Sequence, residues 1–164
     1  MPDHILERRV WLPRPRPEVF ELFADPRNLS RLQPAWARPR WLVAPPARLA
    51  AGAVLDFRVA VLPGAWRVII REFDPPYRFV DAQLRGPFAR WEPRHRFVEG
   101  PAGDEPAALS GTWVEDRVTY RLPLGVVGRA AHAFGVGRRI RGLFDYRDRR
   151  LRELLGSPSR SVSE

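Results

Sequence analysis

The middle of the chain, residues 53–122, consists of short stretches in which apolar and polar residues alternate. Leu55, Phe57 and Val59, for example, are separated from one another by single charged residues. A period of two is typical of a strand that buries one face. Turn signals such as Pro63-Gly64 separate the stretches, so consecutive strands should pair as antiparallel neighbours. The strands predicted here are Ala53–Val61, Ala65–Phe73, Arg78–Arg85, Ala89–Glu99 and Thr112–Leu122.

The residues before this region predict two further strands and two short helices. Pro17 suits the first turn of a helix, and Asp25-Pro26 ends that helix. Asn28 is a favourable cap for a second helix. The predicted elements are a strand at His4–Leu12, a helix at Pro17–Ala24 with Val19, Phe20 and Phe23 on its apolar side, a helix at Leu29–Gln33 and a strand at Arg40–Val43.

The last part of the chain predicts one long amphipathic helix, from about Val126 to Leu155, with arginines opposite its apolar side. Glycines weaken a helix, so we expect it to be loosened at Gly135-Val136-Gly137. The polar segment Gly100–Gly111 is expected to be a mobile loop, and Gly156–Glu164 a disordered tail. The apolar residues at helical spacing are Ala130, Phe134, Ile140, Leu143, Phe144, Leu151 and Leu154.

A length of 164 residues is typical of a single domain with a core of its own. The antiparallel sheet has one face to bury, and the C-terminal helix is the element large enough to cover it. We therefore predict an α+β domain over residues 1–155. A strongly curved sheet that wraps around a helix tends to leave a cavity between the two.

Composition narrows the possible functions. The net charge is +9, and all 28 basic residues are arginine. They are spread over the whole length and alternate with apolar residues, as on solvated faces, so nucleic-acid binding is not expected. The absence of cysteine excludes disulfides and thiolate chemistry. No apolar run reaches the ~18–20 residues of a membrane span, and the N-terminus lacks the apolar segment of a secretory signal, so a cytoplasmic location is expected.

Several stretches resemble the START-like superfamily, which includes polyketide cyclases/dehydrases, coenzyme-Q-binding proteins and plant lipid carriers. They are similar above all to the bacterial START-like proteins that occur alone or fused to sugar-epimerase-like domains. The stretches that carry the resemblance are LPRPRPEVFELFADPRNLSRLQPAW (12–36), PPYRFVDAQLRGPFARWEPRHRF (75–97), GTWVEDRVTYRLPLG (111–125) and IRGLFDYRDRRLREL (140–154).

The resemblance implies a helix-grip fold. In this fold a curved antiparallel sheet of about six or seven strands wraps around a long C-terminal helix, and two short helices follow the first strand. The resemblance also implies the pattern Trp-x-His-x-His-x-Phe on the sixth strand. This sequence departs from that pattern and reads Trp91-Glu92-Pro93-Arg94-His95-Arg96-Phe97. Pro93 replaces the first histidine, so any role that needs two histidines on this strand is lost.

The alternation assigns side chains to the two faces of each strand. Arg90, Glu92, Arg94 and Arg96 share a face that should be solvated. On Arg78–Arg85 the resemblance favours an inward Phe79, Asp81 and Gln83, whereas hydrophobicity alone favours Val80, Ala82 and Leu84. The side chains predicted to face inward on the last two strands are Trp91, Pro93, His95 and Phe97, and Val114, Asp116, Val118 and Tyr120.

The predicted pocket is therefore largely apolar with a few polar groups. A buried Asp116 needs a partner, which could be His95 or an arginine of the C-terminal helix, Arg139 or Arg147. The candidate polar groups are His95, Asp116, Tyr120, Asp81 and Gln83. The candidate walls are Trp66, Phe79, Trp91, Phe97 and Phe134, although for each one alone ordinary core packing is the preferred interpretation. Trp36 and Trp41 either lie at the mouth or pack on the surface.

These features favour a carrier or sensor that binds a small hydrophobic ligand, lipid-, isoprenoid- or polyketide-like, and uses no cofactor. One alternative is an enzyme of the cyclase/dehydrase type in which His95 and Asp116 act as acid and base. Another is a module whose arginine-rich surface binds an acidic membrane or a partner protein. His4, His95 and His132 lack metal-ligand spacing, so no metal site is expected.

Overall fold

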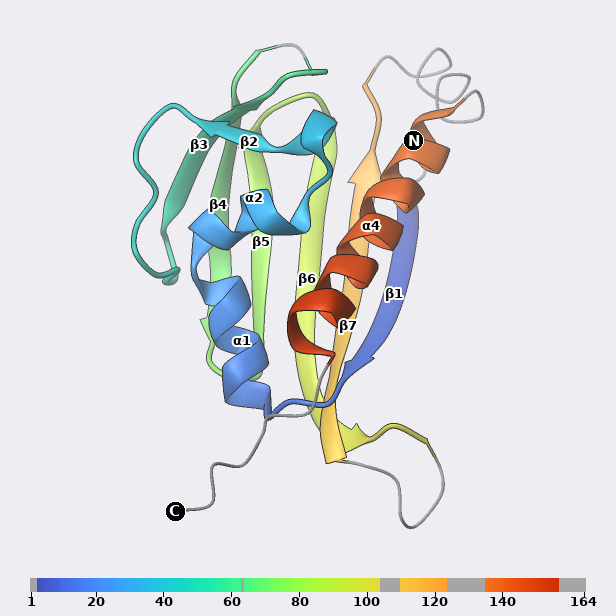
Figure 1. Cartoon of the computed structure of the whole chain (residues 1–164). Helices are drawn as coiled ribbons and strands as arrows, with labels where there is room; N and C mark the ends of the chain where they lie inside the picture. Colours follow the sequence, from blue (N-terminus) through green and yellow to red (C-terminus); the bar gives the residue numbers. More distant parts are fainter. Residues whose placement is uncertain (1–2, 63, 104–109, 124–134, 157–164) are drawn as a thin grey trace.

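The computed structural model describes residues 3–62, 64–103, 110–123 and 135–156. Within them the strands form a seven-stranded antiparallel sheet in the order β1-β7-β6-β5-β4-β3-β2. The first strand therefore pairs with the last, and the others follow as a meander (Figure 1). The strands are β1 (His4–Leu12), β2 (Pro39–Trp41), β3 (Val54–Val59), β4 (Trp66–Asp74), β5 (Arg78–Arg85), β6 (Arg90–Pro101) and β7 (Ser110–Arg121).

The helices all lie on one side of the sheet, with α1 and α2 beside α4 (Figure 1). This is the curved sheet and covering helix that the sequence predicts, so the α+β helix-grip prediction is confirmed. None of the described helices is long and apolar enough to cross a membrane. The helices are α1 (Arg16–Ala24), η1 (Pro26–Asn28), α2 (Leu29–Leu32), η2 (Ala35–Ala37) and α4 (Gly137–Leu155).

The C-terminal helix differs from its predicted extent. α4 begins at Gly137, shortly after Gly135, which has a φ of 148°. Only glycine adopts such a φ without strain, so the predicted weak point requires a glycine just before α4. Residues 124–134 lie outside the described part of the chain, and so does the predicted start of the helix near Val126. The predicted tail falls almost wholly outside it as well.

Most strand boundaries agree with the prediction, and β1 and β5 have the predicted bounds. The short strand predicted at Arg40–Val43 forms instead at Pro39–Trp41, where it pairs with β3. The segment predicted as the loop Gly100–Gly111 is shorter, because Gly100 pairs with Gly111 and Pro101 with Ser110 at the end of the β6–β7 ladder. Residues 104–109, the middle of that segment, are outside the described part.

Two features position the site. First, the β6–β7 register places His95 directly opposite Asp116. Second, the β4–β5 pairing shifts register between Arg67 and Val68 and again between Ile70 and Glu72. Such irregularities bend a strand and increase its twist, so they help the sheet to curl around the helices.

The core lies between the sheet and the helices. Phe20 of α1 is fully buried and contacts the rings of Phe73, Phe79 and Phe97. Leu151, near the end of α4, is fully buried in the same cluster. α1 thus buries Val19, Phe20 and Phe23 as predicted. This packing closes the sheet at the end where α1 meets the last turns of α4.

The prediction that Glu92 is solvated is wrong. Its side chain points away from the helices but is only 8% exposed. Arg94 donates to its carboxylate at 3.1 Å, and Arg71 and Arg90 lie within 3.4 Å. Long arginine side chains from the same face cover the carboxylate and neutralise it, so a charged residue becomes buried on the outer surface of the sheet.

Candidate functional site

A cavity of about 290 Å³ lies between the sheet and the helices. This is near the lower end of the range for small-molecule sites. Its wall is mostly apolar and comes from the curved sheet, from the segment α1–η2 and from α4. Apolar side chains that line it include Phe23, Leu32, Phe57, Val59, Ile140 and Phe144.

Five of the predicted site residues line this cavity: Trp66, Phe79, Asp81, Trp91 and His95. The uncertainty about β5 is resolved in favour of an inward Phe79 and Asp81. Val80 and Ala82 are nevertheless buried too, and Leu84 is 53% exposed. The other predicted residues lie elsewhere: Phe134 is outside the described residues, and Gln83, Phe97, Asp116 and Tyr120 are not among the lining residues.

Gln83 serves the adjoining turn instead of the cavity. Its side-chain amide donates to the Phe88 carbonyl at 2.6 Å, and its carbonyl oxygen accepts from the Phe88 backbone N–H at 3.4 Å. The glutamine thereby closes the turn between β5 and β6. A polar residue near a turn often satisfies the backbone there, which alternation within the strand does not reveal.

Phe97, Tyr120 and Asp116 face inward as predicted but are covered by neighbours. Phe97 packs edge-on against Phe20 and Phe23 in the core. Tyr120 is buried beside Ile140 and Phe144 of α4, and burial raises the pKa of its phenol. An inward orientation therefore does not by itself bring a side chain to the cavity.

A chain of four charged or polar side chains runs from the cavity wall into the core. Asp81 Oδ1 lies 3.2 Å from His95 Nε2, and His95 Nδ1 lies 2.5 Å from Asp116 Oδ1. Arg147 of α4 donates from Nη2 to Asp116 Oδ2 at 2.5 Å. Asp116 thus has both partners that the sequence left as alternatives, the histidine and Arg147. Arg139, the other candidate, does not contact it.

The burial of the chain determines its electrostatics. Burial alone would raise the pKa of the Asp116 carboxyl, but the charges and hydrogen bonds of Arg147 and His95 outweigh it and lower the pKa from 3.8 to about 2. Burial alone would lower the pKa of His95, but the charge of Asp116 and the hydrogen bonds that His95 makes to Asp116 and Asp81 outweigh it and raise the pKa. His95 is therefore held towards its protonated form between two carboxylates.

Asp81 is the member of this chain that offers an uncommitted acceptor atom to a ligand. Both ring nitrogens of His95 are used within the chain, and the Asp116 side chain is only 1% exposed. The Asp81 side chain is 17% exposed and lines the cavity, and its Oδ1 binds His95. Its second oxygen, Oδ2, accepts no hydrogen bond from the described residues and can accept one from a ligand.

Three lining residues each keep a buried polar atom without a protein partner among the described residues. They are Arg147 Nε, Trp66 Nε1 and Gln33 Oε1. The Arg147 guanidinium lies between the rings of Phe23 and Phe144, 4.9 and 5.2 Å from their centroids. A buried donor or acceptor without a hydrogen bond costs free energy. Polar ligand atoms or water that bonded to these three atoms would therefore stabilise the site.

The mouth of the cavity combines one aromatic, one aliphatic and one charged side chain. Trp36 of η2, Val61 and Arg139 are all exposed and all line the cavity. Trp36 is therefore at the mouth, whereas Trp41 packs edge-on against Phe57 and does not line the cavity.

The helical walls of the cavity were not predicted as site residues. Ile140, Leu143, Phe144 and Arg147 on α4 line it, at the spacing i, i+3, i+4 and i+7. This spacing is the signal of one helix face, and the three apolar members were predicted only as part of the buried stripe. Within the described residues, no cluster of three metal-binding side chains occurs.

The fold and the cavity define the class of protein: a helix-grip domain with an internal apolar site, which is a hydrophobic ligand-binding fold. The family model described as "Polyketide cyclase / dehydrase and lipid transport" matches residues 12–144. The chain belongs to this family, within the START-like superfamily. A search of curated proteins found no significant match.

Solved structures share the fold. The protein TTHA0849 from Thermus thermophilus has a TM-score of 0.61 and 20% identity over 93% of this chain and 99% of that one. Ms6760 from Mycobacterium smegmatis has a TM-score of 0.61 and 16% identity over 93% and 90%. The nucleoside-diphosphate sugar epimerase from Corynebacterium glutamicum has a TM-score of 0.65 and 25% identity over 92% of this chain, which corresponds to 29% of that protein.

Proposed function

We propose that the protein is a carrier or sensor that binds a small, mostly hydrophobic molecule in the cavity between the sheet and α4. The observation that carries this proposal is the apolar hollow with Asp81 at its wall. Removal of apolar ligand surface from water supplies the affinity, at roughly 25 cal/mol per Å². Asp81, held by His95, accepts a hydrogen bond from the ligand and sets its orientation.

The test fills the cavity from α4. The neutral fluorophore N-phenylnaphthylamine, which brightens in apolar surroundings, serves as the probe. Leu143→Trp places a larger side chain at the wall and is expected to weaken probe binding about tenfold or more, equivalent to about 1.4 kcal/mol. Leu84→Trp makes the same exchange at an exposed position that does not line the cavity, and should bind as the wild type does.

Circular dichroism and thermal melting of both variants establish that they are folded. Equal probe binding by the wild type and by folded Leu143→Trp would contradict a ligand site in this cavity. Native mass spectrometry of protein purified from its own host then identifies the molecule that occupies the site.

Acid–base catalysis is a second candidate, and the chain Asp81–His95–Asp116 is the observation that favours it. Of the catalytic pair suggested by the sequence, His95 lines the cavity and Asp116 does not. Both ring nitrogens of His95 are hydrogen-bonded within the chain, so Asp81 is the member at the wall that keeps a free acceptor. Asp81→Asn preserves the shape of the side chain and removes the carboxylate that could act as a base at the cavity wall. A carrier should lose at most about tenfold in affinity, whereas an enzyme should lose about 10²- to 10⁴-fold in turnover.

Mass spectrometry distinguishes the two functions. The co-purified molecule is incubated with the wild type and with Asp81→Asn, and any loss of water or ring closure is followed over time. A molecule that the wild type leaves unchanged over many hours supports the carrier. Conversion by the wild type that stops in Asp81→Asn supports the enzyme.

A further inference from the structure

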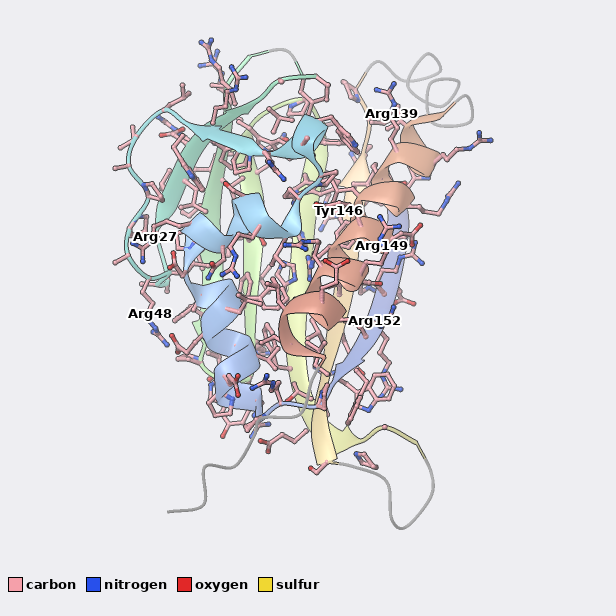
Figure 2. All side chains as sticks on the ribbon, viewed as in Figure 1. Arg27, Arg48, Arg139, Tyr146, Arg149 and Arg152 are labelled. Atoms are coloured by element: carbon pink, nitrogen blue, oxygen red, sulfur yellow. The ribbon has the colours of Figure 1, made fainter. Side chains whose placement is uncertain are left out.

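A second hollow adjoins the mouth of the cavity. It shares Trp36, Val61 and Arg139 with the cavity and continues along α4. Its further lining residues are Pro34, Gly142, Tyr146 and Arg149. The four α4 residues follow the spacing i, i+3, i+7 and i+10, so they lie on one face of the helix. Figure 2 labels Arg139, Tyr146 and Arg149 along this helix.

The two arginines of this hollow lack acidic partners. Arg139 and Arg149 are exposed, and within the described residues no carboxylate pairs with either guanidinium; Arg149 lies 5.6 Å from the Tyr146 ring. No acidic residue lines the hollow. Some exposed arginines elsewhere have carboxylate partners, as the pairs Arg27–Asp25, Arg48–Glu21, Arg67–Asp56 and Arg117–Glu7 show, whereas others, such as Arg40 and Arg58, have none among the described residues. Arg139 and Arg149 differ from these in that both line a hollow next to the mouth of the cavity.

At Gly142 no side chain covers the surface of the helix between the two arginines. A Cβ atom built at this glycine would meet nothing within 4 Å, so packing does not require the glycine. Glycine inside a helix is unfavourable relative to alanine, and here no neighbour compensates for it. At 1.5 Å rise per residue, Arg139 and Arg149 stand about 15 Å apart along the axis, with Gly142 and Tyr146 between them.

We propose that this hollow binds the anionic head group of an amphipathic ligand whose hydrocarbon part occupies the cavity. The inference rests on the proposed function, because it assigns a chemical class to the same ligand. Arg139 belongs to both hollows, so a ligand that extends out of the cavity passes its guanidinium. Arginine binds carboxylate and phosphate oxygens through two parallel N–H donors, which makes either group suitable.

The test compares three probes with the same ten-carbon alkyl chain: undecanoate, decyl phosphate and decanol. Calorimetric titration at low salt measures their affinities for the wild type. The acids are expected to bind about tenfold more tightly than the alcohol, because charge-assisted hydrogen bonds to arginine add to the same apolar burial. Of the two acids, the tighter binder indicates whether the natural head group is a carboxylate or a phosphate.

The double variant Arg139→Gln/Arg149→Gln should lose most of the preference for the acids over decanol, measured as the ratio of the affinities within the variant. Its control is Arg40→Gln/Arg58→Gln. That variant removes the same net charge from two exposed residues of the β2–β3 pair that line neither hollow, and it should keep the preference.

The outcomes separate the two proposals. If decanol and both acids bind the wild type equally, the head-group site is overturned and the hydrophobic cavity stands. If the preference for acids survives in Arg139→Gln/Arg149→Gln, or disappears equally in the control, the assignment to these two arginines is overturned. If none of the three probes binds, the proposed function fails and the head-group site fails with it.

Discussion

At the scale of single residues, Asp116 and Arg147 form an ion pair whose side chains are 1% and 7% exposed. Removing one member of such a pair leaves the other charge buried without compensation, which typically costs about 3–5 kcal/mol. His95 links the pair to Asp81 at the cavity wall. The same contacts thus connect the stability of the fold to the chemistry of the site.

These contacts predict how stability depends on pH. The Asp116 carboxyl has a pKa of about 2 in the folded protein against an ordinary 3.8, so it stabilises the fold fully above pH 3.8. This contribution, about 2 kcal/mol, is lost as the pH falls from about 3.8 to about 2. The raised pKa of His95 acts in the opposite sense: its contribution is complete below pH 6.5 and is lost as the pH rises through the raised value. Urea denaturation at a series of pH values measures both limbs.

Two variants test whether Asp116 causes the loss of stability at acid pH. Asp116→Asn should be about 3–5 kcal/mol less stable than the wild type at neutral pH and should have a flatter acid limb. Asp81→Asn, at the more exposed end of the chain, should cost much less. An acid limb that is unchanged in Asp116→Asn would show that other carboxyl groups cause it.

At the scale of elements, two glycines with opposite surroundings determine what β7 and α4 tolerate. Gly111 is buried where β7 pairs with β6, and a Cβ atom there would lie 2.3 Å from the Leu12 carbonyl oxygen and 2.7 Å from the Trp11 ring. At Gly142 of α4, the same atom would meet nothing within 4 Å. The close approach of β1 to β7 thus requires glycine at position 111, whereas α4 does not require it at 142.

Alanine substitutions at the two positions should therefore have opposite effects. Gly142→Ala is expected to raise the free energy of unfolding by about 0.5–1 kcal/mol, because alanine is the better helix former. Gly111→Ala should lower it by about 1–3 kcal/mol, because backbone atoms of β1 must move. Chemical denaturation of the two variants beside the wild type measures both changes. Equal effects in the same direction would refute this account of the packing.

At the scale of the whole molecule, the core and the cavity adjoin each other between sheet and helices, and core residues such as Phe23, Phe57 and Phe79 also line the cavity. A ligand that binds only the folded state stabilises it by mass action, by about 2.7 kcal/mol at one hundred times its Kd. For a chain of this size, this predicts a rise in Tm of about 5–10 °C. Differential scanning calorimetry with and without undecanoate measures this rise in Tm, and the Tm of Leu143→Trp should rise little. A ligand that bound to the outer surface would shift both proteins alike.

Local patterns in the sequence were sufficient to determine the elements and their faces. Alternation predicted the bounds of β1 and β5 and the inward sides of β6 and β7, because a period of two depends only on the pleat of each strand. The helical period of Ile140, Leu143 and Phe144 predicted the buried side of α4 for the same kind of reason. The resemblance added the helix-grip fold as a whole and the inward orientation of Asp81.

The tertiary structure decided how deep each inward side chain lies and what it meets there. Asp116 and Phe97 face inward, yet Arg147 of α4 covers Asp116, and Phe20 and Phe23 of α1 cover Phe97, while Asp81 reaches the cavity. Periodicity within one element carries no information about the distance to the next. That distance is set by packing between residues far apart in the chain, and only the assembled sheet and helices determine which side chains border the empty space.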